Sequence, residues 1–337
     1  SPFLRIPLLK GVPMVFLFII EHTMLPIFGL TALGFLLDKK LHLDVRTLSK
    51  FLMYIVIPSF IFTSIYTTDF PATSVPIILT VLFFLILSAL LAEGVGKARG
   101  YDAGMIRACR NALMFNNTGN LGVSLILLIF SHPPFLVNGQ PVYLAEAMVV
   151  QLVIYVIQSV FLNTLGLYQA ARGNLTVHDT LSVIFRMPMV YMISAALICR
   201  WAEIDATQFF FWPVLDMAGH ALLPVAMITV GIQLSQSGIG RFNTDVCIAG
   251  VIKLIFLPIL GLCTVYAANW MAPGTFSAVG SMVFLVYCSI PTAVNTAFFA
   301  MEFNNNGDYA LQTVMNTTAF SAFTIPIVVY LGHLLFV

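Results

Sequence analysis

Charged side chains are scarce in this sequence of 337 residues, since Asp, Glu, Lys and Arg make up only 9% of it against 60% hydrophobic residues. So few charges cannot cover the surface of a water-soluble globule, which carries about 25% charged residues. The formal net charge is only +1 and no dense Lys or Arg cluster is present, so we expect no nucleic-acid partner. The mean hydropathy of +0.98 predicts an integral membrane protein.

The sequence also lacks the patterns of a disulfide framework, a metal site or a common catalytic motif. Its five cysteines lie far apart and mostly within apolar runs. No GxSxG, HExxH or P-loop motif is present. Tyr101-Asp102 and Asn306-Gly307-Asp308 faintly resemble the paired motifs of intramembrane aspartyl proteases, but the second lacks its first glycine and both fall in polar joints. We therefore expect neither an enzyme nor a bound metal or other cofactor.

Long apolar runs separated by short polar joints fill the chain instead. Each run approaches the roughly 20 residues that a helix needs to cross the hydrocarbon core, and no strand-like alternation accompanies them. We predict an all-α membrane protein with ten transmembrane helices, near residues 20–37, 48–66, 75–91, 112–130, 142–167, 181–199, 209–234, 246–268, 276–301 and 311–336.

The polar joints, placed alternately on two sides of the membrane, gather most Lys and Arg on one side. By the positive-inside rule that side is cytoplasmic, and both termini then lie outside the cytoplasm. The cytoplasmic group is Lys39, Lys40, Arg46, Lys50, Lys97, Arg99, Arg107, Arg110, Arg172, Arg186 and Arg241, against Arg5, Lys10 and Arg200 on the other side.

Ten spans divide into five plus five, and an odd number in each half inverts the second half relative to the first. The predicted domains are an interfacial or leader-like segment (1–19), a first five-helix repeat (20–168), a cytoplasmic joint with the start of the sixth helix (169–186) and a second repeat (187–337). Pro58 in the second span and Pro224 in the seventh lie at comparable depth, and we predict that both break helices of a scaffold.

The fourth and ninth spans carry polar interruptions. Glycines loosen a helix by about 1 kcal/mol each relative to alanine, and amides at membrane depth need partners. In the fourth span we predict that Gly119 and Gly122 make the break. In the ninth, Pro291 removes a backbone donor and disfavours helix at the residue before it. The polar residues of the two segments are Asn116, Asn117, Thr118, Asn120, Thr292, Asn295 and Thr296.

A pair of interrupted spans in corresponding positions is the best sequence indicator of a transporter's binding site. The free N–H groups at such interruptions carry partial positive charge and can hold a carboxylate without a buried Arg or Lys. The alternative is that these Asn, Thr and Gly residues serve only as hydrogen-bonding and close-packing contacts between helices.

Five stretches of the chain resemble the auxin efflux carrier family, including its bacterial members: LPIFGLTALGFLLDKKLHLD (25–44), SKFLMYIVIPSFIF (49–62), NTGNLGVSL (117–125), PTAVNTAFFAMEFN (291–304) and FTIPIVVYL (323–331). The resemblance implies two inverted five-helix repeats with crossing fourth and ninth helices, similar to bile acid and sodium–proton transporters. It implies a scaffold of the first, second, sixth and seventh helices, a transport domain of the rest, and a homodimer through the scaffold.

The resemblance also implies a small organic anion as substrate, either auxin-like or a mono- or dicarboxylate, and a bacterial inner membrane as the location. The family's fourth-helix asparagine falls on Asn117, and plant members have prolines where this chain has Ser124 and Thr296. The predicted substrate-binding residues are therefore Asn116, Asn117, Thr118, Gly119, Asn120, Ser124, Pro291, Thr292, Asn295 and Thr296.

Ionisable residues at bilayer depth are candidates for coupling or gating, because they are costly there. Asp216 and His220, four residues apart, could share a proton, and Lys253 could reach the cytoplasmic surface or pair with Glu93. Glu146 and Glu302 complete this set. Coupling to Na⁺, coupling to H⁺ and uniport all stay open. So do two alternative functions, a sensor that keeps the transporter fold and a sodium-coupled symporter of the bile-acid type.

Overall fold

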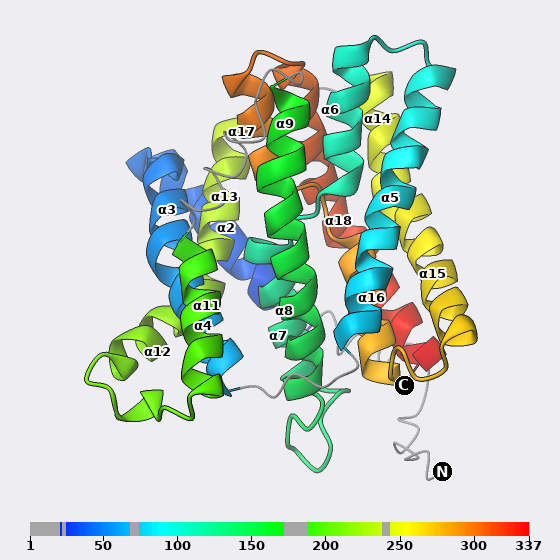
Figure 1. Ribbon diagram of the computed structural model, residues 1–337. Helices are drawn as coiled ribbons and strands as arrows, with labels where there is room; N and C mark the ends of the chain where they lie inside the picture. Colours follow the sequence, from blue (N-terminus) through cyan, green and yellow to red (C-terminus); the bar gives the residue numbers. More distant parts are fainter. Residues whose placement is uncertain (1–20, 22–24, 68–73, 172–187, 238–242, 337) are drawn as a thin grey trace.

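The computed structural model describes residue 21 and residues 25–67, 74–171, 188–237 and 243–336 (Figure 1). Over these ranges the chain is helical, and its only β-type pairings are two isolated bridges. The predicted segment 1–19, most of the predicted joint 169–186, and Arg5, Lys10, Arg172, Arg186 and Arg241 lie outside the described residues.

Long apolar helices dominate the described chain, as expected of an integral membrane protein. Five segments are long and apolar enough to cross a membrane: Thr47–Thr67, Val75–Ala98, Leu144–Ala170, Thr244–Met271 and Gly307–Phe336. A sixth is obtained if Trp212–His220 and Leu222–Gln236, which are bent by 40° against each other, form one span. The all-α membrane class predicted from hydropathy is confirmed.

One group of helices, which we call the small bundle, occupies the left of Figure 1. Its members pack on one another: α2 against α13, and α4 against α11 and α12. The backbones of α2 and α13 touch, because a Cβ added at Gly231 would lie 1.9 Å from the carbonyl oxygen of Thr31. The small bundle comprises α2 (Leu25–Leu41), α3 (Val45–Phe51), η2 (Leu52–Val56), α4 (Ile57–Thr67), α11 (Pro188–Trp201), η5 (Ala206–Gln208), α12 (Trp212–His220) and α13 (Leu222–Ser237).

The two scaffold prolines differ in their effect. Pro58 does not break its helix, because Thr47–Thr67 runs on as one span and the π-helical turn η2 lies directly before the α4 segment that contains this proline. Pro224 lies in the first turn of α13, directly after the bend from α12. The expected break is therefore wrong for Pro58 and present beside Pro224.

The other group, the large bundle, carries both interrupted spans. Its centre is aromatic, with Phe84, Phe284 and Tyr287 edge to face at 5.5 to 5.8 Å between ring centroids. It comprises α5 (Ser74–Ala98), α6 (Ala103–Met114), η3 (Thr118–Val123), α7 (Ser124–Phe130), α8 (Leu144–Phe161), η4 (Leu162–Gly166), α9 (Leu167–Ala170), α14 (Thr244–Val251), η6 (Ile252–Phe256), α15 (Leu257–Met271), α16 (Ala278–Ser289), α17 (Val294–Glu302) and α18 (Gly307–Phe336).

Both interruptions expected from the sequence are present, and they lie against each other. The first separates α6 from η3, and the second separates α16 from α17. Asn116 and Thr292 form an isolated antiparallel bridge between them. The N–H of Asn117 donates to the carbonyl of Pro291 at 2.9 Å, and the N–H of Ala293 donates to the carbonyl of Phe115 at 2.9 Å. Each extended stretch thus satisfies backbone groups that the other would leave bare in the membrane.

The glycines of the fourth span do not make its break, and this corrects the prediction. The break at residues 115–117 precedes Gly119 and Gly122, which lie inside the π-helical turn η3. A Cβ at Gly119 would lie 2.8 Å from the ring of Tyr155, and one at Gly122 would lie 2.8 Å from Nε2 of Gln151. The glycines therefore allow close contact between η3 and α8.

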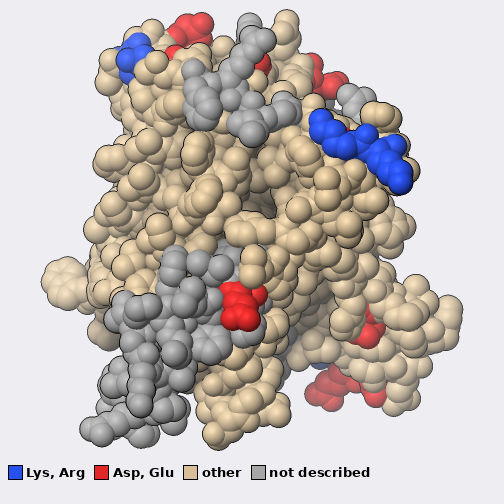
Figure 2. Space-filling model, turned by 180° about the vertical axis from the view of Figure 1, so that it is seen from behind, with Lys and Arg blue, Asp and Glu red and all other residues tan. Residues whose placement is uncertain are grey.

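Basic residues gather at one end of the molecule. Figure 2 shows Lys and Arg at the upper end of the rear face, with Asp and Glu at both ends. Arg99, in the joint after α5, lies 3.0 Å from Asp245, which also accepts a hydrogen bond from the Tyr101 hydroxyl at 2.7 Å. Burial, and then this bond, raise the pKa of Tyr101 to about 12, so the phenol stays protonated and remains the donor at neutral pH.

Candidate functional site

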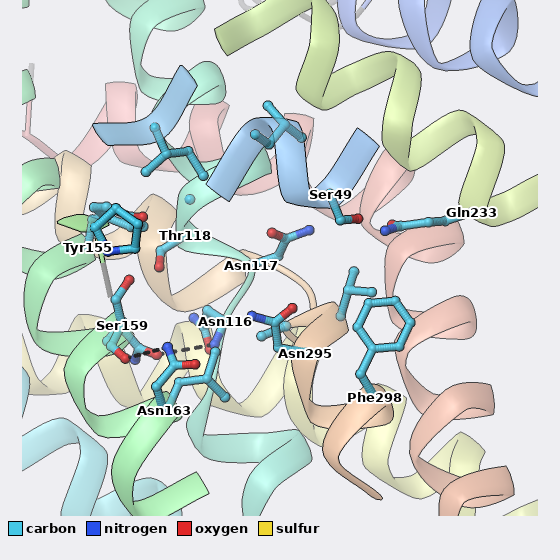
Figure 3. Close-up of a pocket in the computed structure, with 18 residues that line it drawn as sticks. Ser49, Asn116, Asn117, Thr118, Tyr155, Ser159, Asn163, Gln233, Asn295 and Phe298 are labelled. Carbon is cyan, nitrogen blue, oxygen red and sulfur yellow. Dashed lines mark hydrogen bonds between the residues drawn. The ribbon is translucent and has the colours of Figure 1, made fainter. Parts of the chain in front are cut away.

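A cavity of about 110 Å³ lies between the small and large bundles, at the point where the two interruptions meet (Figure 3). The small bundle contributes Ser49, Leu52, Ile57, Pro188 and Gln233. The interruptions contribute Asn116, Asn117, Thr118, Gly119, Ala293, Val294, Asn295 and Phe298, and the α8–η4 helix contributes Tyr155, Gln158, Ser159, Leu162 and Asn163. We call this cavity the crossing pocket. None of its described lining residues is charged.

Two helix N termini open at the crossing pocket. Thr118 and Gly119 begin the helix that runs through η3 and α7, and Val294 and Asn295 begin α17. The first N–H groups of a helix have no acceptor within it, and together they carry partial positive charge. Neither Asn117 nor Ala293, the residues before these helices, caps them with its side chain. The N–H of Thr118 already donates to the carbonyl of Asn116 at 2.7 Å, and the remaining N–H groups of the two first turns bring partial positive charge to the pocket without a cation among its described lining residues.

The C-terminal end of α6 is covered by Lys253. This side chain from η6 is fully buried, and its Nζ donates to the carbonyl of Leu113 at 2.9 Å, to the carbonyl of Phe115 at 3.4 Å and to Oδ1 of Asn116. Three acceptors match the three N–H donors of a lysine ammonium group. A positive charge at this point compensates the partial negative charge at the end of α6.

Both polar atoms of the Asn116 side chain are hydrogen bonded within the protein. Its Oδ1 accepts from Lys253, and its Nδ2 donates to the carbonyl of Tyr287 at 2.6 Å, which ties the broken end of α6 to that of α16. Its backbone N–H donates to Oε1 of Gln158 at 3.3 Å, and the amide nitrogen of Gln158 donates to Met114 and Tyr287. Asn116 touches the crossing pocket, but its amide holds the crossing together.

Asn117 has the opposite role. Its side chain is only 7% exposed, and among the described residues its Nδ2 has no hydrogen-bond partner. Figure 3 shows the side chains of Asn117, Asn295, Ser49 and Gln233 around one space. An unsatisfied buried donor costs about 1–3 kcal/mol, which an acceptor on a ligand would recover. Asn117 is therefore the donor in this site that is available to a ligand.

The structure brings half of the predicted binding residues to the pocket, namely Asn116, Asn117, Thr118, Gly119 and Asn295. The others are not among its described lining residues. Ser124 is fully buried in α7, and Asn120 lies in η3. Pro291, Thr292 and Thr296 support the crossing: Pro291 accepts from Asn117, the Thr292 hydroxyl donates to the carbonyl of Ala112 at 2.9 Å, and the Thr296 hydroxyl donates to that of Ala293 at 2.7 Å.

The predicted binding residues did not include the pocket residues of α8 and of the small bundle. A signal for the α8 face was present, because Gln151, Tyr155, Gln158 and Ser159 recur at intervals of three or four residues and share one side of an otherwise apolar helix. Ser49 and Gln233 gave no such signal, since each lies near the end of a span where polar residues are common.

The predicted coupling residues lie in very different places. Lys253 neither reaches the surface nor pairs with Glu93, which instead pairs with Arg110 and, at 3.2 Å, with Lys97. Both expectations for Lys253 are therefore wrong, because carbonyl groups freed at the break of α6 offer it closer acceptors. The four other candidates are not among the described lining residues of the pocket: Asp216 and His220 form an exposed 3.6 Å pair on α12, and Glu146 and Glu302 are exposed at the start of α8 and the end of α17.

A second cavity of about 200 Å³ adjoins the crossing pocket. The two share four lining residues, Asn117, Gln233, Val294 and Phe298. From these the second cavity extends along largely apolar side chains of α13, α17 and α18 to Asp44 and Gln236. These shared residues, Phe298 among them, therefore lie between the crossing pocket and a larger space beside it.

Comparisons with known proteins find similarity to membrane transport proteins. The model of a family described as "Membrane transport protein" matches residues 19–183 and 181–329. A protein described as an uncharacterized transporter, from Methanothermobacter thermautotrophicus, is 22% identical over 320 residues, which cover 91% of this chain and 96% of that protein.

Proposed function

Because the chain belongs to the membrane transport protein family of the auxin efflux carrier type, we propose that it is a secondary transporter or uniporter that moves a small organic anion by alternating access. The observation that carries the proposal is the buried Nδ2 of Asn117, which has no hydrogen-bond partner among the described residues and lies beside the N termini of two helices. No chemical reaction is proposed for the site.

The charge distribution of the crossing supports an anion as the substrate. The N termini of η3 and α17 direct partial positive charge at the pocket. The partial negative charge at the C-terminal end of α6 is compensated by Lys253, which also bonds to Asn116. A carboxylate placed beside Asn117 and Asn295 would accept hydrogen bonds from neutral donors. Since none of the described lining residues is an Arg or Lys, the carboxylate could also be released.

The arrangement of helices supports movement of one bundle against the other. We propose two inverted five-helix repeats, in residues 20–168 and 187–337, whose fourth and ninth helices are the interrupted ones. In this scheme the small bundle is the scaffold and the large bundle is the transport domain, and the scaffold also forms a homodimer. The crossing pocket has walls from both bundles, so relative movement would open it to one side and then to the other.

The second cavity supports one direction of opening. It leads from the shared residue Phe298 toward Asp44, which lies in the joint between α2 and α3. The helix ends beside this joint carry Lys39, Lys40 and Lys50. We propose that this is the cytoplasmic path, by the positive-inside rule, with both termini on the outer side of a bacterial inner membrane. Phe298 would then be part of the inner gate.

The test uses purified protein in two formats. A thermal-shift screen against small mono- and dicarboxylates and indole-3-acetate, with and without Na⁺ and at two pH values, should identify a stabilising anion and the coupling ion. Counterflow of that labelled anion in proteoliposomes should then show exchange, which the Asn117→Ala variant should lose. Binding without exchange would make the protein a sensor, and stabilisation by no carboxylate would contradict the proposed substrate class.

A further inference from the structure

A groove of about 280 Å³ lies on the outside of the large bundle, between the α14–η6 helix and α18. One wall includes Cys247, Gly250 and Leu254, and the other includes Asn316, Phe320 and Thr324. It shares no described lining residue with the crossing pocket or with the second cavity. The groove is therefore a separate site, which the proposed transport function does not use.

The groove faces the lipid. Both of its walls belong to helices long and apolar enough to span the membrane, Thr244–Met271 and Gly307–Phe336. Ile255 and Phe320, two large apolar residues of its walls, are about half exposed. Asn316 is the tenth residue of α18, so it lies about 14 Å along the helix from Gly307, at a depth where water is scarce.

Two polar side chains of this apolar groove have no partner in the part of the chain that the structure describes. Asn316 is only 4% exposed, and neither its Nδ2 nor its Oδ1 is hydrogen bonded. The Oγ1 of Thr324, two turns farther along α18, is also buried and unbonded. A carboxamide left unsatisfied in hydrocarbon is costly, so a membrane-borne partner is favoured at this position.

We propose that this groove binds a membrane lipid whose head is uncharged and bears a free hydroxyl, as in a diacylglycerol. A hydroxyl donates one hydrogen bond and accepts others, so it can satisfy Oδ1 and Nδ2 of Asn316 together. None of the described lining residues is charged, which disfavours a phosphate or ammonium head group. The apolar walls accommodate the acyl chains.

The bound lipid touches helices that hold the crossing. Leu254 of the groove follows Lys253, which covers the broken end of α6. Asn316 precedes Thr317, whose hydroxyl accepts a hydrogen bond from the backbone N–H of Thr292 at 3.3 Å. Lipid binding should therefore stabilise the purified protein against thermal unfolding, in addition to covering the groove.

The test uses two native cysteines of the full chain in detergent. Cys247 is exposed in the groove, and Cys263 is exposed on α15 outside it. Saturating 1,2-dioctanoylglycerol should slow modification of Cys247 by N-ethylmaleimide at least about fivefold and leave Cys263 unchanged, as measured by mass spectrometry of the labelled peptides. Equal protection of both cysteines, or of neither, would overturn the proposal.

The hydroxyl is tested with the methyl ether of the same diglyceride, which should bind about tenfold more weakly because it cannot donate to Oδ1 of Asn316. Asn316→Leu should remove this tenfold preference without lowering the thermal stability of the lipid-free protein. Equal binding of the alcohol and its ether to the wild-type protein would contradict the assignment of Asn316.

A second variant blocks the groove. A Cβ at Gly250 would meet no atom within 4 Å, so Gly250→Ala is the matched control, and Gly250→Phe extends a ring from the same open position into the groove. Stabilisation by dioctanoylglycerol should persist in Gly250→Ala and vanish in Gly250→Phe, and its persistence in Gly250→Phe would refute the site. None of these measurements depends on transport, and Asn117→Ala should bind the diglyceride like the wild type.

Discussion

Nζ of Lys253 donates a hydrogen bond to Oδ1 of Asn116, and this contact joins η6 to the first interruption across 137 residues of chain. It positions the only described charged group at the crossing behind the binding site, at the negative end of α6. Asn117, one residue farther along, has an amide nitrogen at the pocket without a hydrogen-bond partner in the part of the chain that the structure describes. Neighbouring asparagines thus differ: Asn116 holds the crossing together, and Asn117 leaves its amide nitrogen to the pocket in which we propose that the substrate binds.

The two asparagines should respond differently to alanine. Asn117→Ala removes no hydrogen bond of its side chain's Nδ2, so thermal stability should stay near that of the wild type while anion uptake is lost. Asn116→Ala removes one of the three acceptors of Lys253 and the side-chain hydrogen bond to the carbonyl of Tyr287, and should lower the free energy of unfolding by about 1–3 kcal/mol. Thermal melts and proteoliposome uptake check both. Unfolding of Asn117→Ala would mean that this residue is a packing contact.

Asn295→Ala should also abolish uptake with little loss of stability, because Asn295 lies in the first turn of α17 at the pocket. Ser124→Ala is the matched control, since Ser124 is a predicted binding residue of the fourth span. Its effect should be milder because Ser124 is not among the described lining residues of the pocket. Uptake assays of both variants at equal protein amounts decide the matter. Normal uptake by Asn295→Ala would remove α17 from the proposed site.

Lys253→Met should weaken binding of the anion while the protein still folds. Methionine replaces the stem of the lysine, but leaves the negative end of α6 uncompensated beside the substrate. A loss of about 1.4 kcal/mol, or tenfold in Kd, is expected. Titration by thermal shift should show this loss for a carboxylate and not for its neutral amide. An equal loss for both ligands would indicate a distorted pocket instead of a missing charge.

The glycines of η3 should tolerate substitution poorly for reasons of space. Gly122→Ala would direct a Cβ to within 2.8 Å of Nε2 of Gln151 and 2.9 Å of Cδ1 of Ile290, so these two fully buried side chains must move. We expect a loss of about 1–3 kcal/mol in the free energy of unfolding. Gly94→Ala in α5, where a Cβ meets nothing within 4 Å, should instead be neutral or stabilise by up to about 1 kcal/mol. Similar melting temperatures for the two variants would contradict the close packing of η3 on α8.

Phe298→Ala should join the crossing pocket to the second cavity, because Phe298 lines both. The expected result is faster passive leak of the anion and weaker discrimination between anions of different size, with little change in expression. Efflux from preloaded proteoliposomes measures the leak, and Phe298→Leu, which retains bulk, is the control. Tight vesicles with both variants would mean that the barrier between the two cavities lies elsewhere.

The ion pair on α12 should be dispensable. Asp216 and His220 are 49% and 78% exposed, and a surface pair of this kind contributes at most about 1 kcal/mol. Asp216→Asn and His220→Gln should therefore transport like the wild type at every pH tested. A displaced pH profile in either variant would return this pair to the set of coupling residues.

Several parts of the site followed from local sequence. Pro291 and the amides at 116, 117 and 295 stood out because polar or helix-breaking residues are expensive inside an apolar run. Other parts could not be found in this way. Gly119 and Gly122 are found both where helices break and where they pack closely, and only the position of Tyr155 and Gln151 distinguishes the two roles.

The sequence by itself determined that the chain is an all-α membrane protein with two interrupted helices, because hydrophobic length and the cost of buried polar groups are properties of each segment alone. Only the tertiary structure decided that the interruptions pair through residues 115–117 and 291–293, that Lys253 covers the broken end of α6, and that Asn117 keeps a donor for the pocket. These depend on contacts between helices far apart in the chain, where several partners compete for the same donors and acceptors and only the packed geometry selects among them.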